Sequence, residues 1–392
     1  MNLKVISNYD SSTALCEVVD KARVCYTNKI WEDIKEEGIS LFDRIKLLNK
    51  LIENGHHSPF DHVQVSIYLE GIPKILAMFL NNEKYYATSE KSFRYTQTKL
   101  EGIEKILYDK WSEKLIKVIR NRYPSLPEKK VNSLASENAR YFLSVFTPTN
   151  MVYTTSLRQL NYISYLFKDF IEEAHELRNE FMLKVSKHME QFRSLLKKNG
   201  LIVQIGNGKE YLTLNPNFRT LSLMNVKEMN CLLAAPMTLD YNYNMNYKQS
   251  FAYLAQAQRH RTTNYKIISI PNPDDCIYFI PYIFEDKKEL SVEWVRDMDL
   301  VKTIYPQGML IDIYESGDIT SLISKCGERL CGHAQFEIMW RTKKTLGMYA
   351  VYNKNPEIGK LISPYLSGPK CTFPNGSCTD PCGFGRALDR LI

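Results

Sequence analysis

The stretch RHRTTNYKIIS, residues 259–269, is the part of this chain that decides how its fold and chemistry are interpreted. Two arginines flank a histidine, and a serine follows the triplet after a spacer of seven residues. Neighbouring side chains on a helix point in different directions, so the triplet cannot form one flat cationic patch. It can hold a phosphate with one arginine, because guanidinium donors match phosphate oxygens, and reach a second ligand with the next side chain. A solvated basic turn is the alternative interpretation of the triplet alone.

A second motif, GHHSPFDH, occupies residues 55–62, far upstream of the first. Its histidines, taken alone, can be explained as helix-end and core side chains that bond to backbone groups. Together the two segments resemble motifs of the flavin-dependent thymidylate synthases, the ThyX family, with Asp61 in place of the family's glutamate. In that family the Arg-His-Arg triplet follows the histidine segment closely. The equivalent place here, LNNEKYY at residues 80–86, carries no triplet.

The separation of the two motifs suggests an internal duplication in which each half has kept a different part of one active site. A chain of 392 residues is long enough for two domains that each bury a core. The turn-forming pair Asn199 and Gly200 predicts a boundary that gives domains 1–200 and 201–392. The resemblance implies an α+β fold: two tandem ThyX-like domains, each a small mixed β-sheet with a helical bundle.

Hydrophobic periodicity and turn residues predict the secondary structure. A helix that begins at residue 14 is expected to run into an extended segment at residues 23–26. Arg23 and Cys25 in that segment are candidates for flavin contact or for packing in a strand core. Strands are expected at residues 3–6, 63–72 and 237–247, and further helices at residues 41–54, 111–122, 127–143, 158–198, 225–234 and 248–261.

The first half carries SEKSFRY at residues 89–95, which resembles the family's Glu-x-Ser-x-Arg-Tyr substrate loop. Ser92 in this loop is expected to position the substrate and not to act as a covalent nucleophile. Arg158 matches the position of a flavin-contacting arginine. The resemblance implies that the first half contacts the nucleotide through the loop and one later arginine: Glu90, Lys91, Ser92, Phe93, Arg94 and Arg140.

The second half supplies complementary motifs. GERLCGHAQFEI, residues 327–338, resembles the family's Arg-x-x-x-His-Ala-Gln-Trp-Glu-Ile segment, with Phe336 in place of tryptophan. The resemblance makes Gln256, Arg259 and Arg329 nucleotide ligands, and Arg259, Ser92 and Arg329 the catalytic set. Seven residues from both halves are implied on the flavin side: His56, Ser58, Asp61, Arg158, His260, Arg261 and His333.

The two sets of motifs scarcely overlap, and together they make one full set. Family active sites form between subunits of a homotetramer, so a tandem chain is expected to form a homodimer that mimics the tetramer. The resemblance implies an FAD-dependent methyltransferase that converts dUMP to dTMP at a composite inter-domain site. Methylenetetrahydrofolate would supply the one-carbon unit and NADPH the reducing equivalents.

Two alternatives remain open at this stage. The altered loop residues Lys91 and Phe93 leave room for a related flavin and folate enzyme that modifies another pyrimidine nucleotide or transfers hydroxymethyl. A catalytically silent paralogue that only binds nucleotide is the other alternative. A protein that cannot be reconstituted with FAD would favour the silent paralogue.

Composition and charge limit the classes of protein to which this chain can belong. With 44% hydrophobic and 24% charged residues, the chain is typical of a folded protein, and its net charge of +7 suits an anionic partner. The amino-terminal sequence has no signal-peptide pattern, and no apolar run approaches the roughly 20 residues that span a bilayer. We therefore expect a cytoplasmic protein with no membrane partner, and we expect no nucleic-acid partner.

Of the nine cysteines, several gather near the carboxy terminus. Close thiolates around proline and glycine turns are compatible with tetrahedral zinc. Reduced thiols in a loop, or a local disulfide, are the alternatives, because the spacing is not that of paired CxxC motifs. The candidate ligands of a structural zinc ion are Cys331, Cys371, Cys378 and Cys382.

Overall fold

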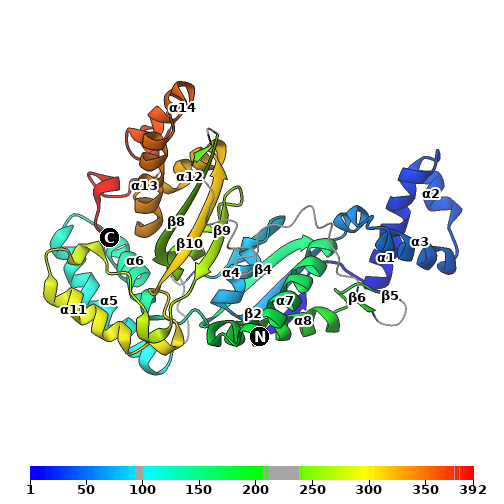
Figure 1. Ribbon diagram of the computed structural model, residues 1–392, viewed down its shortest axis with the longest axis horizontal. Coiled ribbons are helices and arrows are strands. Elements are labelled where there is room, and N and C mark those ends of the chain that lie inside the picture. The colour runs from blue at the N-terminus through cyan, green and yellow to red at the C-terminus, as the bar shows by residue number, and fades with distance from the viewer. Residues whose placement is uncertain (93–99, 206–208, 211–237, 240, 375, 379) are drawn as a thin grey trace. The chain divides into compact units, whose positions relative to one another are not determined.

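The computed structural model describes residues 1–92, 100–205, 209–210, 238–239, 241–374, 376–378 and 380–392 (Figure 1). Phe93, Arg94 and the helix expected at residues 225–234 lie outside the described residues. The chain divides into two compact units. Unit 1 comprises Met1–Lys91 and Pro148–Ser222, and unit 2 comprises Ser92–Thr147 and Leu223–Ile392. The division is interleaved along the sequence, whereas the predicted boundary at residue 200 concerns a sequence repeat and stays a prediction.

Unit 1 is built on a four-stranded sheet with the order β1-β2-β4-β3. Its strands are β1 (Asn2–Val5), β2 (Gln64–Pro73), β3 (Tyr86–Glu90) and β4 (Pro148–Ser156). Every described pair in it is antiparallel, so the predicted mixed sheet is wrong in this respect. Alternate side chains of β2 (Val65, Ile67 and Leu69) are fully buried, because successive residues of a strand point to opposite faces.

Helices α4 (Lys74–Asn82), α7 (Leu157–Leu177) and α8 (Glu180–Lys198) pack against this sheet (Figure 1). The single helix expected at residues 158–198 is two helices. Arg178 has a left-handed backbone with φ of 50°, and Asn179 caps α8 by accepting a hydrogen bond from the Met182 amide at 3.0 Å. Unit 1 also contains α1 (Ser11–Arg23), α2 (Trp31–Glu37), α3 (Leu41–Glu53), and the short strands β5 (Gln204–Ile205) and β6 (Lys209–Glu210).

The segments around the histidine motif are short and helical. Residues 24–26, expected to be extended, form the 3-10 turn η1 (Val24–Tyr26), which continues α1. The motif itself follows α3, where Gly55 adopts a φ of +73° that favours glycine over other residues. It then forms η2 (Ser58–His62), which leads directly into β2.

Unit 2 has a second antiparallel sheet, with the order β7-β8-β10-β9. Its strands are β7 (Thr238–Leu239), β8 (Asn242–Ser250), β9 (Asn264–Ser269) and β10 (Leu310–Asp318). Helix α10 (Phe251–Ala257) follows β8, so the helix expected at residues 248–261 is shorter at both ends. Helices α12 (Ile319–Arg329), α13 (Phe336–Tyr352) and α14 (Pro356–Leu366) follow β10.

Two helices from the first half of the sequence belong to unit 2: α5 (Gly102–Arg122) and α6 (Glu128–Ala139). They pack with α11 (Lys288–Asp299) around an aromatic core. Trp111 is fully buried, meets Trp294 edge to face with 4.8 Å between ring centroids, and donates to Asp297 Oδ2 at 2.9 Å. No helix among the described residues is long and apolar enough to cross a membrane.

Candidate functional site

Unit 1 brings together two residues of the predicted flavin side, Asp61 and Arg158. Asp61 Oδ2 lies 2.7 Å from Arg158 NH1, and Asp61 Oδ1 accepts a hydrogen bond from Ser156 Oγ at 2.8 Å. Ser156 also caps α7 through the Gln159 amide at 3.1 Å. Arg158 Nε is buried and has no hydrogen-bond partner among the described residues. The ion pair therefore fixes the guanidinium and leaves one of its donors available.

The two adjacent histidines of the motif, His56 and His57, have different environments. His57 is buried, and its Nε2 donates to the Ile52 carbonyl at 3.1 Å. Burial, together with the nearby charges of Arg158 and His56, lowers the pKa of His57, which favours a neutral ring. Its Nδ1 is buried without a partner in the described part of the chain. His56 and Ser58 are exposed, so their side chains are accessible to a ligand.

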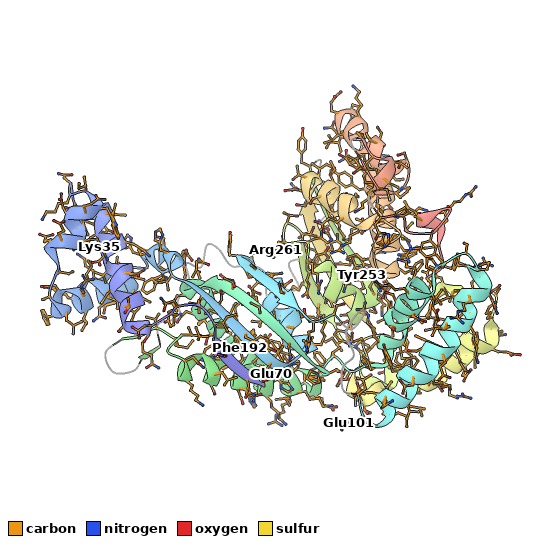
Figure 2. The ribbon with its side chains drawn as sticks, turned by 180° about the vertical axis from the view of Figure 1, so that it is seen from behind. Lys35, Glu70, Glu101, Phe192, Tyr253 and Arg261 are labelled. Carbon is orange, nitrogen blue, oxygen red and sulfur yellow. The ribbon has the colours of Figure 1, made fainter. Side chains whose placement is uncertain are left out.

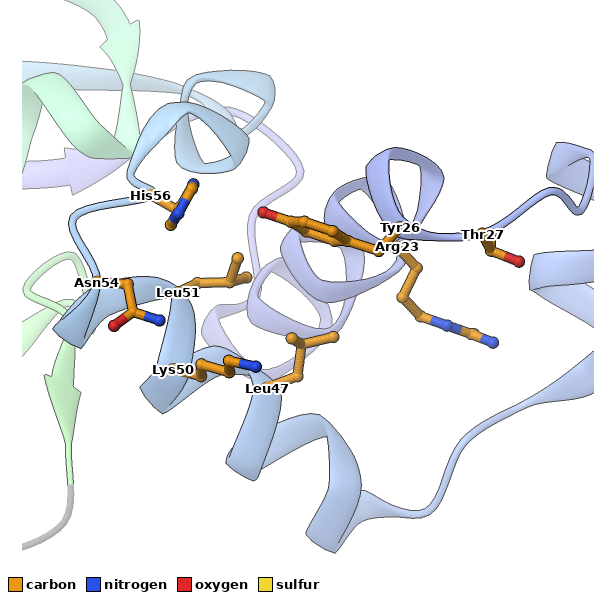
Figure 3. A pocket seen from close by; sticks show the side chains of 8 residues that line it. All are labelled: Arg23, Tyr26, Thr27, Leu47, Lys50, Leu51, Asn54 and His56. Carbon is orange, nitrogen blue, oxygen red and sulfur yellow. The ribbon is translucent and has the colours of Figure 1, made fainter.

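A cavity of about 420 Å³ lies beside His56 in unit 1 (Figure 3). This volume is within the range of pockets that hold small molecules or cofactors. The Tyr26 and His56 rings are edge to face, with centroids 6.5 Å apart. The wall combines apolar side chains, aromatic rings and cations: Arg23, Tyr26, Thr27, Leu47, Lys50, Leu51, Asn54 and His56.

Sequence reasoning found His56 and considered Arg23, but it missed most of this wall. Four of the lining residues have the i, i+3, i+4, i+7 spacing of one helix face, at Leu47, Lys50, Leu51 and Asn54. That spacing was a usable signal, because it places a lysine and an asparagine on an otherwise apolar face. The Arg23 guanidinium is held by Glu37 Oε2 at 2.5 Å and by the Ile34 carbonyl at 3.1 Å.

The predicted substrate loop is only partly described. The Glu90 side chain is 2% exposed, forms an ion pair with Lys74, and accepts from Asn81 Nδ2 at 3.2 Å. A substrate contact from Glu90 would therefore have to replace interactions within unit 1. The Lys91 side chain is exposed, and Ser92 is half-buried.

In unit 2 the Arg-His-Arg triplet follows α10 in a turn, so its side chains point to different surroundings. Arg259 and Arg261 are exposed, whereas His260 is 4% exposed (Figure 2 labels Arg261). Gln256, near the end of α10, is buried. The two arginines are thus exposed to solvent, and the histidine faces the interior of the unit.

His260 contacts Arg329, a predicted nucleotide ligand at the end of α12. Arg329 Nε donates to His260 Nε2 at 2.5 Å. Burial, the Arg329 charge and the Lys325 charge lower the pKa of His260 to about 2. A lowered pKa favours the neutral imidazole, so the two arginines, and not His260, carry the positive charge of the triplet.

Arg140 lies in the same unit as Arg259 and Arg329, on the 3-10 turn η3 (Arg140–Phe142). It is buried, and its Nε donates to the Glu137 carbonyl at 3.1 Å. The next residue, Tyr141, donates to Glu337 Oε2 at 2.6 Å. This bond joins the turn that carries Arg140 to the segment at residues 327–338.

His333, predicted on the flavin side, contacts α6 and the carboxy-terminal tail. Lys130 Nζ lies 3.2 Å from His333 Nδ1, and His333 Nε2 lies 2.8 Å from the Asp380 carbonyl. Both ring nitrogens are therefore engaged within unit 2. A flavin contact by His333 stays a prediction.

The predicted zinc site is wrong for the described residues, which include all four candidate thiols. No group of three or more His, Cys, Asp or Glu side chains among them is arranged to hold a metal ion. The physical reason is that the thiols have separate local partners. Cys378 donates to the Asp380 carbonyl and Cys382 to the Phe384 carbonyl, Cys331 accepts from the His333 amide, and Cys371 is exposed.

The comparison with protein families matches the amino-terminal part of the chain. Residues 5–196 match the family described as thymidylate synthase complementing protein. The flavin-dependent thymidylate synthase of Clostridium tetani is 25% identical over 198 residues, which cover 43% of this chain and 77% of that protein. The enzyme of the same name from Geobacter sulfurreducens is 23% identical over 148 residues, or 36% of this chain and 62% of that one.

Solved structures give weaker likenesses. Thymidylate synthase X from Helicobacter pylori, solved with FAD and dUMP, has a TM-score of 0.32 and 15% identity over 54% of this chain and 97% of its own. The UMP/dUMP methylase PolB from Streptomyces cacaoi, bound to 5-Br dUMP, has a TM-score of 0.29 and 19% identity. That match covers 42% of this chain and 76% of the methylase. Scores this low do not establish that the folds superpose. Over residues 5–196, slightly less than half of its length, the chain is therefore similar to the thymidylate synthase complementing protein family, that is, to the ThyX-like proteins.

Proposed function

We propose that this chain is a flavin-dependent thymidylate synthase that converts dUMP to dTMP. The observation that carries the proposal is the division of the motifs. The flavin-side pair Asp61 and Arg158 lies in unit 1, and the exposed arginines of the triplet lie in unit 2. Unit 2 also carries His260 and His333, which the resemblance implies on the flavin side, so the chain as a whole holds residues of both kinds.

Shared topology supports the idea that the two units derive from a tandem repeat. In each sheet the first strand pairs with the second, the second with the fourth, and the fourth with the third, counted along the chain. In each unit a helix follows the second strand directly, α4 in one and α10 in the other. Longer helices follow the fourth strand in each, α7 and α8 in unit 1 and α12, α13 and α14 in unit 2, and a serine or aspartate caps the first of them.

The residues present in unit 1 fit a flavin dinucleotide. The cavity beside His56 offers apolar and aromatic walls for a planar ring system and Lys50 for an anionic group. Arg158 keeps a buried donor for an acceptor that the described residues do not supply. FAD, when bound, would supply the hydride for the reduction, with NADPH as the source of reducing equivalents and methylenetetrahydrofolate as the one-carbon donor.

On the nucleotide side, the side chains of unit 2 would bind and orient the pyrimidine nucleotide. Arg259 presents a guanidinium to solvent at the end of α10, where it can take a phosphate in bidentate fashion. Arg329 would lie on the base side, with a guanidinium that His260 already holds. Ser92 and Arg94 would complete the nucleotide contacts without forming a covalent bond.

The test is reconstitution with FAD followed by tritium release from 5-[³H]-dUMP in the presence of methylenetetrahydrofolate and NADPH. Stoichiometric flavin uptake and release of tritium would support the proposal. Flavin uptake without release, but with turnover of another pyrimidine nucleotide, would favour the related enzyme. A protein that binds dUMP but takes up no flavin would overturn the enzymatic proposal and favour a silent nucleotide-binding paralogue. Size-exclusion chromatography with light scattering would test the expected homodimer.

A further inference from the structure

The contact between His260 and Arg329 has a defined hydrogen-bond polarity. Arg329 Nε can only donate, so His260 Nε2 must be the unprotonated acceptor. The proton of the neutral ring then sits on Nδ1. Glu328 Oε2 lies 3.6 Å from that nitrogen. The same carboxylate oxygen lies 3.9 Å from Arg329 NH2, so the carboxylate, the imidazole and the guanidinium form a cluster in which each faces the other two.

The backbone on both sides of His260 is held in place. The His260 amide donates to the Ala257 carbonyl at 3.0 Å, and the His260 carbonyl accepts from the Thr263 amide at 3.1 Å. Ser321 Oγ, on α12, donates to the Thr262 carbonyl at 3.0 Å. The turn that carries the triplet is therefore attached to the helix that carries Arg329, which keeps the backbone of His260 beside that helix.

Several charged groups surround the imidazole. Arg329, Glu328 and Lys325 face it from α12, and Lys325 is itself paired with Glu315 of β10 at 2.7 Å. Arg259 and Arg261 are its neighbours in the turn. The cations outnumber the carboxylates, and His260 is 4% exposed. Both effects disfavour a positively charged ring, whose second N–H would also oppose the Arg329 donor.

We propose that His260 is a positioning residue that orients the Arg329 guanidinium toward the pyrimidine nucleotide, and that it is not a flavin ligand. This inference rests on the proposed function, and it assigns the middle residue of the triplet to the nucleotide side. Because the guanidinium is planar, the hydrogen bond from Nε to His260 also determines the direction in which NH1 and NH2 point. Arg259 and Arg261, which are exposed, keep their direct ligand-binding roles.

The first experiment reads the geometry and does not depend on turnover. Long-range ¹H–¹⁵N spectra of histidine-labelled protein, assigned with a His260→Gln variant, should show the Nδ1–H tautomer, with no titration between pH 5 and 8. An Arg329→Lys variant, which loses the Nε donor, should change the His260 Nε2 shift. A protonated Nε2, or a midpoint near 6.5, would overturn the proposal. If the protein proves inactive, this result still decides whether the contact exists.

The second experiment separates positioning from flavin binding. His260→Leu removes the acceptor, whereas His260→Gln can restore one through its amide oxygen. In titrations and steady-state assays, His260→Leu should weaken dUMP binding or lower kcat/KM on the order of tenfold to a hundredfold, with flavin affinity kept within threefold. His260→Gln should recover most of that loss. Loss of flavin affinity with dUMP binding intact would overturn the proposal. Urea unfolding of each variant controls for misfolding. Only variants whose urea unfolding midpoint matches that of the unmodified protein are then titrated with dUMP, so a loss of binding cannot come from misfolding.

Discussion

Replacing Glu315 with glutamine is expected to destabilise unit 2 by about 3–5 kcal/mol, since it leaves a buried ammonium without its counter-charge. Glu315 and Lys325 have side chains that are 0% exposed, and their charged atoms lie 2.7 Å apart. The carboxylate also accepts from the Tyr243 hydroxyl at 2.9 Å and from the Tyr253 hydroxyl at 3.4 Å (Figure 2 labels Tyr253). A glutamine has the same shape, but its amide N–H groups would face these donors.

Two control variants separate the charge from the hydrogen bonds. Tyr243→Phe removes one hydrogen bond and is expected to cost about 1 kcal/mol. The double variant Glu315→Gln with Lys325→Met should recover most of the lost stability, because it leaves no buried charge without a counter-charge. Burial lowers the pKa of Lys325, whereas the Glu315 carboxylate raises it. Removing the carboxylate therefore lowers the pKa of Lys325 further. The unfolded lysine then binds more protons than the folded one, and the stability of the single variant should rise as pH increases from 7 to 9.

Urea unfolding followed by tryptophan fluorescence is a suitable assay. Of the four tryptophans, Trp111, Trp294 and Trp340 lie in unit 2, so a Trp31→Phe background makes the signal specific to that unit. A loss of less than 1 kcal/mol for Glu315→Gln at pH 7, or no recovery in the double variant, would refute the reasoning.

Three further predictions concern the site. Arg94→Ala and Arg259→Ala should each abolish tritium release; recovery on mixing the two inactive variants would mean that chains share a site, and full activity in both would contradict the assignment. Asp61→Asn should weaken flavin binding about fivefold in a fluorescence titration, because Arg158 loses the exposed partner that orients it, and unchanged affinity would count against the flavin role. His260, with a pKa lowered from 6.5 to about 2, stays unprotonated when folded, so stability should fall by about 1.4 kcal/mol per pH unit below 6.5. His260→Gln should flatten that slope in urea unfolding between pH 6.5 and 5, and equal slopes would be evidence of a titrating ring.

Local patterns in the sequence predicted the elements whose shape depends on neighbours in the chain. The alternation at residues 63–72 gave β2 to within one residue, and the apolar periodicity with Gly55 gave α3 and its end. The break at Arg178 was missed because hydrophobic periodicity continues across it. Only the capping residue Asn179 marks the second start, and asparagine is common enough inside helices that it does not stand out.

The buried polar groups could not be predicted, because their partners are distant in sequence. Burial and the charge of Arg329, which lies 69 residues away, lower the pKa of His260, and Trp111 bonds to Asp297, which lies 186 residues away. A triplet of two arginines and a histidine looks uniformly cationic until the fold buries its middle member. The motif comparison identified which residues to examine, whereas tertiary contacts decide which of them carry charge.

The interleaving of the two units changes how the sequence halves relate to the chemistry. Arg140 comes from the first half, yet its turn belongs to unit 2, where Tyr141 bonds to Glu337 at 2.6 Å. Helix α5 from the same half supplies Trp111, which fills the core beside Trp294. Removing the first half would therefore take out part of the core that supports the second-half arginines Arg259 and Arg329. The two halves depend on each other for folding as well as for their motifs, so excising either one would test stability before it could test catalysis.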